Sequence, residues 1–167
     1  MAGLYAMTYP DHATAEGAMV RLKGLEEAGY LRILERALVL KDDKGNVDIN
    51  ETLHPVRDGA LTGGVIGALA GLIFLAPIPG AAVGAAIGGL IGNIGSSGAN
   101  SDFEAYAGTI KRELPNGGAA VVVLGASDAR ERVIQNLGEF GGTVHSFDIP
   151  DDDLAKIQNE VDRLSSK

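Results

Sequence analysis

The chain has no cysteine, no tryptophan and only 5% aromatic residues among its 167 positions. The absence of cysteine excludes disulfides, a thiol nucleophile and thiolate metal ligands, so nothing in the sequence indicates an oxidising compartment. Positive charge is also scarce, because 14 Lys and Arg against 22 Asp and Glu give a formal net charge of −8. A surface of that sign does not bind phosphates by counterion release, so we expect no nucleic-acid partner.

Charge is missing altogether between Gly59 and Ser101, and half of the 24 glycines lie in residues 59–98. This shift in composition predicts one domain with an insertion. Residues 1–58 and 100–150 are expected to form the two halves of the domain, residues 59–99 the insertion and residues 151–167 a terminal helix. The amino terminus lacks the basic and apolar regions of a signal peptide, so we expect the folded part in the cytoplasm.

Hydrophobic patterns before the insertion predict a strand, a helix and a second strand. The alternating residues 4–9 form the first strand, and Asp11 caps a helix whose apolar residues recur at three- and four-residue spacing. Gly29 ends that helix, and the second strand covers residues 31–40.

After the insertion, a helix capped by Ser101 or Asp102 is expected to continue to Leu114. Residues 119–149 then repeat the order of residues 4–40, with a buried strand at 119–124, a helix capped by Asp128, a glycine stop at 141–142 and a strand at 143–149. Two such units predict an α+β fold, a ferredoxin-like sandwich of two βαβ units in which helices cover one face of a four-stranded sheet. A C-terminal helix begins at Asp151.

No metal site is predicted. The polar turn at 41–46, before a short strand at 47–49, resembles part of a calcium loop but lacks the donor spacing and closing glutamate of an EF-hand. The acidic residues 151–153 suit the positive end of a helix dipole and need no cation.

The most specific pattern is a glycine at every fourth position in two series separated by Pro77-Ile78-Pro79. On helices, each series forms a stripe without side chains that lets another helix approach closely. We therefore predict a glycine-zipper helical hairpin whose packing and assembly residues are Gly59, Gly63, Gly67, Gly71, Gly80, Gly84, Gly88 and Gly92.

The surroundings of this hairpin are left open by the sequence. Each arm spans roughly 25 Å, somewhat less than the ~30 Å hydrocarbon core of a bilayer, although no charge interrupts either arm. The alternative is a soluble oligomer in which hairpins from several copies share a core, because an exposed apolar hairpin would aggregate.

Catalytic constellations are not found. His12, His54 and His145 have no partner at helical spacing, and the turn Gly125-Ala126-Ser127-Asp128, whose backbone N–H groups could hold an anion, lacks a P-loop lysine. No catalytic, cofactor or metal residue is predicted, and the chain is not expected to be an enzyme.

Several segments resemble one known family: Ala15 with Leu22-Lys23-Gly24-Leu25, Leu31-Arg32-Ile33-Leu34, Gly45, residues 67–74, Asp102-Phe103 and Val121-Val122-Val123-Leu124. The chain is similar to the bacterial and archaeal domain-of-unknown-function proteins often described as predicted membrane proteins, with a glycine-rich hairpin inside a ferredoxin-like domain. The resemblance implies that architecture and membrane association, and no catalytic residues.

Three functional hypotheses follow. The first is a non-enzymatic structural protein on the cytoplasmic side of a membrane, with the hairpin inserted in the bilayer and copies associating through the glycine stripes. The second is a soluble homo-oligomeric assembly protein. The third is a small-molecule sensor domain, which rests on analogy between folds.

Overall fold

A computed structural model describes residues 2–50, 69–70, 73–74, 99–139 and 141–165 of the chain. Its elements are β1 (Ala2–Tyr9), α1 (His12–Glu27), β2 (Arg32–Lys41), β3 (Val47–Asn50), α4 (Ala99–Glu113), β4 (Ala119–Ala126), α5 (Arg130–Gly138), β5 (Thr143–Ile149) and α6 (Asp151–Ser165). The strands form one antiparallel sheet in the order β3-β2-β4-β1-β5. The predicted α+β class is thereby confirmed.

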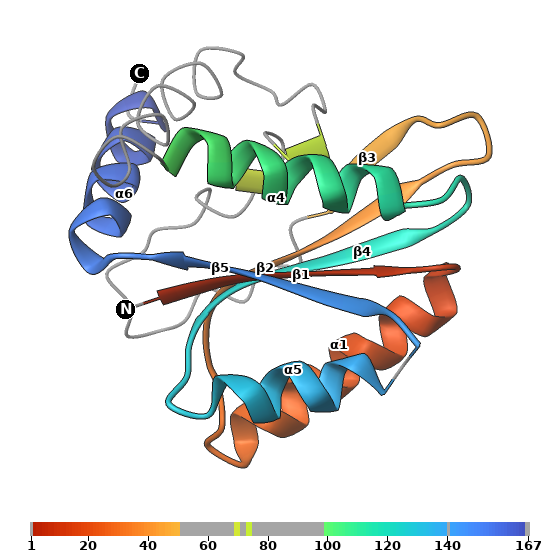
Figure 1. The fold of residues 1–167 in the computed structure, drawn as a ribbon, viewed down its shortest axis with the longest axis horizontal. Coiled ribbons are helices and arrows are strands. Elements are labelled where there is room, and N and C mark those ends of the chain that lie inside the picture. Colours follow the sequence, from red (N-terminus) through yellow and green to blue (C-terminus); the bar gives the residue numbers. More distant parts are fainter. Residues whose placement is uncertain (1, 51–68, 71–72, 75–98, 140, 166–167) are drawn as a thin grey trace.

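Helices cover both faces of this sheet, α1 and α5 on one and α4 on the other (Figure 1). Successive side chains of a strand point to opposite faces, so β1 contributes Tyr5 and Met7 to the α1/α5 side and Leu4 and Ala6 to the α4 side. The central strand β4 is buried from Ala119 to Gly125 because neighbouring strands and both helical layers enclose it. The expectation of helices on one face of a four-stranded sheet is therefore wrong, since α4 covers the second face and β3 adds a fifth strand.

A bulge in β2 decides which of its residues face which layer. The pairing with β4 shifts between Ile33, opposite Gly125, and Glu35, opposite Leu124. An extra residue reverses the alternation of side chains along a strand. Ile33 consequently packs with α1 and α5, whereas Ala37 and Val39 pack on the α4 side.

The caps of the helices follow the sequence in one case and depart from it in two. Asp11 caps α1 as predicted, because its Oδ1 accepts a hydrogen bond of 2.7 Å from Thr14 N. The helix after the insertion starts at Ala99, so neither Ser101 nor Asp102 is its cap. Asp128 does not cap α5 either, because that helix begins two residues later and its N-cap, Ala129, makes no side-chain hydrogen bond.

Tyr9 offers a pH-dependent test of the core between the sheet and α1. Its side chain is 1% exposed, its hydroxyl has no hydrogen-bond partner among the described residues, and burial raises the pKa of Tyr9 to about 12 from its ordinary 10. The folded state keeps the neutral hydroxyl to a higher pH than the unfolded state does. The burial of neutral Tyr9 therefore contributes its full stabilisation below pH 10, and this stabilisation is lost as pH rises towards 12.

Tyr9→Phe is expected to leave the free energy of unfolding at neutral pH unchanged or to raise it by up to about 1 kcal/mol, because an unpaired buried hydroxyl is removed. The variant should also lose less stability than the parent on alkalinisation. Urea unfolding at a series of pH values measures both effects. A clear loss of stability at neutral pH would show that the hydroxyl forms a stabilising bond.

Candidate functional site

The eight glycines predicted to form the assembly stripes lie outside the described residues. They are Gly59, Gly63, Gly67, Gly71, Gly80, Gly84, Gly88 and Gly92. The glycine zipper therefore stays a prediction.

Four described residues of the same uncharged segment are buried in the core. Leu69, Ala70, Ile73 and Phe74 are helical and are 1%, 0%, 1% and 5% exposed. Their spacing places them on one side of a helix. They belong to the cluster on the α4 side of the sheet, together with Leu4, Ala6, Ala37, Val39, Phe103, Ile110, Leu114, Ala120, Val122, Leu124 and Ile149. We call these four residues the anchor stripe, because they attach the apolar segment to the sheet.

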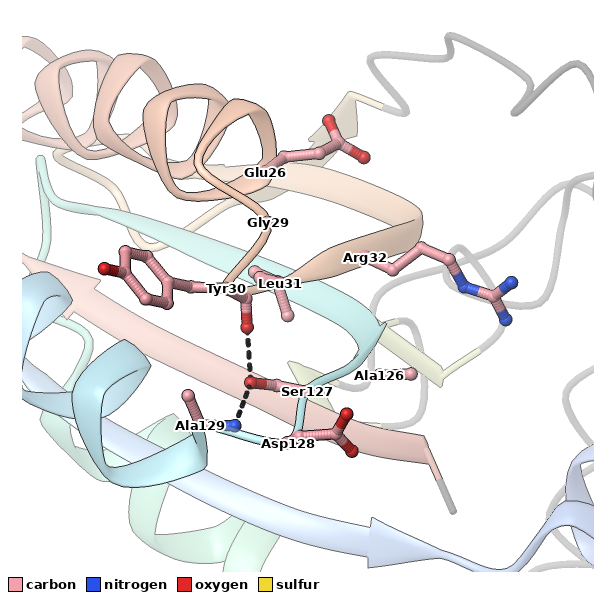
Figure 2. Close-up of a pocket in the computed structure, with 9 residues that line it drawn as sticks. All are labelled: Glu26, Gly29, Tyr30, Leu31, Arg32, Ala126, Ser127, Asp128 and Ala129. Carbon is pink, nitrogen blue, oxygen red and sulfur yellow. Dashed lines mark hydrogen bonds between the residues drawn. The ribbon is translucent and has the colours of Figure 1, made fainter.

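A second feature is a cavity of about 410 Å³ at the end of the sheet where β2 begins and β4 ends (Figure 2). The α1–β2 connection contributes Glu26, Gly29, Tyr30, Leu31 and Arg32 to its lining. The β4–α5 connection contributes Ala126, Ser127, Asp128 and Ala129. Pairing of Arg32 with Ala126 brings the two connections together, although they are far apart in the sequence.

Polar bonds hold the two walls of this cavity to each other. Ser127 Oγ donates a 2.5 Å hydrogen bond to the carbonyl oxygen of Tyr30 and accepts one of 3.0 Å from Ala129 N. The guanidinium of Arg132 lies 4.7 Å from the centre of the Tyr30 ring, a cation–π distance. The sequence offered only weak support to an anion on the N–H groups of the turn at 125–128, and the N–H group that follows this turn, that of Ala129, is bonded to Ser127.

The histidines form one pair with a carboxylate in the described part of the chain. His145 Nε2 lies 2.6 Å from Glu113 Oε2, which links β5 to the end of α4. The sequence did not indicate this pair, because the two residues are 32 positions apart. Ser146 follows in the strand and therefore points to the opposite face, where Arg130 Nη2 donates a 2.5 Å hydrogen bond to its hydroxyl. This arrangement does not place a hydroxyl nucleophile beside the imidazole.

Comparison with known proteins identifies the family. The family described as "Protein of unknown function (DUF1269)" matches residues 60–162, more than half of the 167-residue chain. The chain belongs to this family. In the same comparison, no curated protein and no solved structure matches the chain. The DUF1269 match includes the anchor stripe, α4, β4, α5 and β5, and so confirms the resemblance to a family of unknown function.

The described part of this DUF1269 chain contains neither a candidate membrane-spanning helix nor a candidate metal site. Within residues 2–50, 69–70, 73–74, 99–139 and 141–165, no helix has both the length and the apolar character needed to cross a bilayer. The same residues contain no group of three or more His, Cys, Asp or Glu side chains that could hold a metal ion. In the 41–46 turn, Asp42 instead accepts hydrogen bonds from Asn46 and Lys44, and these bonds, those of Asn46 first, lower the pKa of Asp42.

Proposed function

We propose that this protein is a non-enzymatic structural protein that associates with a membrane from its cytoplasmic side and with further copies of itself through residues 59–99. The observation that carries the proposal is the absence of any charge from Gly59 to Ser101, in a segment that the anchor stripe attaches to the sheet of an acidic domain. In this proposal the domain holds the apolar segment at the membrane surface, and the glycine series provides helix contacts.

The proposed architecture is a ferredoxin-like domain interrupted by a helical hairpin. Without the edge strand β3, the strand order is β5-β1-β4-β2, and α1 and α5 share one face. This order supports the assignment of two split βαβ units, β1-α1-β2 and β4-α5-β5. The opposite face, covered by α4 and the anchor stripe, is the side from which the hairpin would extend.

A second candidate is a soluble homo-oligomer whose hairpins share a core. The burial of Leu69, Ile73 and Phe74 favours it, because these apolar side chains already have partners within the chain. An apolar segment that packs in part on its own domain needs less additional cover. The third hypothesis, a small-molecule sensor, depends on the cavity between the two connections.

Fractionation of cells without detergent separates the first two candidates. Membrane association predicts that the protein sediments with membranes and stays there through salt and carbonate washes. A monodisperse soluble particle larger than one chain would contradict membrane association and support the soluble oligomer. A soluble monomer would contradict both.

Gly67→Leu and Gly84→Leu test the glycine stripes. Both changes are expected to reduce oligomer size and thermal stability, because a side chain in the stripe separates the helices. Gly24→Leu in α1 is the matched control, since a Cβ at Gly24 meets nothing within 4 Å. Analytical ultracentrifugation and thermal melting of the three variants give the answer. Unchanged values in Gly67→Leu and Gly84→Leu would refute the zipper.

A further inference from the structure

The open cavity between the α1–β2 and β4–α5 connections is large enough for a small molecule. Its volume of about 410 Å³ lies in the range typical of ligand pockets, and Leu31, 2% exposed, is its buried apolar residue. Three charged side chains, Glu26, Arg32 and Asp128, belong to the lining and extend towards the same side in Figure 2.

The charges of this cavity are not neutralised within it. Arg32 and Asp128 have no ion-pair partner among the described residues. Glu26 accepts one long hydrogen bond, of 3.3 Å, from the backbone N–H of Ile33. The nearby cations are engaged elsewhere, because Arg130 pairs with Asp148 at 2.6 Å and Arg132 lies over the Tyr30 ring. The cavity therefore offers two carboxylates and one guanidinium to a ligand.

We propose that this cavity binds a small basic amino acid with two amino groups and one carboxylate. The two ammonium groups match the carboxylates of Glu26 and Asp128, and the ligand carboxylate matches the guanidinium of Arg32, which binds such groups in a bidentate manner. The net positive charge of this ligand complements the excess of one negative charge in the lining. The acidic protein as a whole, with a net charge of −8, also attracts a cation.

The walls of the cavity are held in place before a ligand arrives. Ser127 bonds the two connections together, and a Cβ at Gly125 would lie 2.9 Å from Leu31 Cδ1 and 3.0 Å from the Arg32 carbonyl oxygen. The two connections are therefore joined both by a hydrogen bond and by close packing. A preformed site loses less conformational entropy on binding than a mobile one.

Titration of ¹⁵N-labelled protein with L-lysine, followed by NMR, tests this assignment. Saturable shifts are expected on the amides of residues 29–32 and 126–130. Asp128→Asn is expected to weaken L-lysine binding about 10-fold, the effect of losing one charge-assisted contact. Arg32→Gln should weaken L-lysine binding similarly but leave unchanged or strengthen the binding of 1,5-diaminopentane, which has no carboxylate and is repelled by the guanidinium. Glu16→Gln, an exposed change on α1 outside the cavity, is the control and should bind L-lysine like the parent.

Three results would overturn the proposal. They are the absence of saturable shifts up to about 10 mM L-lysine, equal binding in the parent, Asp128→Asn and Arg32→Gln, and tighter binding of L-glutamate than of L-lysine. Each variant changes an exposed side chain, so thermal melting can verify that the fold is retained. These outcomes are independent of membrane fractionation, because none of the residues lies in the segment 59–99.

Discussion

Ile73→Ala is expected to lower the free energy of unfolding of the α+β domain by about 2–5 kcal/mol. Ile73 is 1% exposed and packs in the cluster that joins the anchor stripe to the sheet and α4. Removing its outer carbons loses their burial and leaves a cavity that the surrounding strands cannot close. Urea unfolding followed by circular dichroism measures the change.

Val20→Ala is the matched control for this prediction. Val20 is a branched apolar residue of α1 that is 74% exposed, so its truncation should change the free energy of unfolding by no more than about 0.5 kcal/mol. If Ile73→Ala were as mild as Val20→Ala, the segment around Ile73 would not contribute to the core of the domain.

Gly118→Ala is expected to destabilise the protein by about 1–3 kcal/mol. A Cβ at this position would lie 2.7 Å from the carbonyl oxygen of Tyr9 and 2.8 Å from Pro115 Cγ. Real Cβ atoms do not approach so closely, and the first neighbour is backbone of β1, so the end of the sheet must shift. Gly118 lies this close to Tyr9 because β4 starts at the next residue, Ala119, which pairs with Tyr9 at the end of β1.

Gly24→Ala should have the opposite sign. Gly24 lies inside α1, where a Cβ meets nothing within 4 Å, so the higher helix propensity of alanine is expected to add about 1 kcal/mol of stability. Thermal or urea unfolding of both variants tests the pair. Equal effects from the two substitutions would contradict the close contact at Gly118.

Much of the sheet and its helices could be predicted because local patterns determine them. The last strand was expected at residues 143–149 and is found there, and Asp11 and Gly29 bound α1 as expected from their capping preferences. The unbroken apolar run at 119–124 correctly indicated a strand buried on both faces. Each of these signals lies within a few residues of the element that it specifies.

Features that depend on distant segments were missed. The bulge near Leu34 has no turn residue to mark it, and its consequence for the two faces depends on how β2 pairs with β4. The cavity arises where the 26–32 and 126–129 segments meet, and in the sequence only the Ala126-Ser127-Asp128 part of its lining was considered as a possible binding turn. Asp128 is a residue type that commonly caps helices, but the hydroxyl of Ser127, and not Asp128, accepts the hydrogen bond from Ala129 N.

The apolar segment shows the limit of pattern reasoning. Helical spacing in residues 65–74 predicts an apolar side but does not specify what covers it. From the sequence, this apolar side was expected to be covered by the second helix of the hairpin, by lipid or by other copies of the chain. The structure places Leu69, Ala70, Ile73 and Phe74 against the sheet of the same chain, and the glycine positions themselves lie outside the described residues.

The attachment of this segment to the sheet is tested most directly by methyl NMR of the intact protein. With labelled Ile, Leu, Val and Ala methyl groups, nuclear Overhauser effects are expected between Ile73 and methyl groups of Leu4, Val39, Ile110 or Val122, its companions in the cluster. Contacts between methyl groups of this kind require separations on the order of 5 Å, the scale of packed core side chains. Cross-peaks from Ile73 only to lipid or detergent, or to none of these four residues, would contradict the anchor stripe.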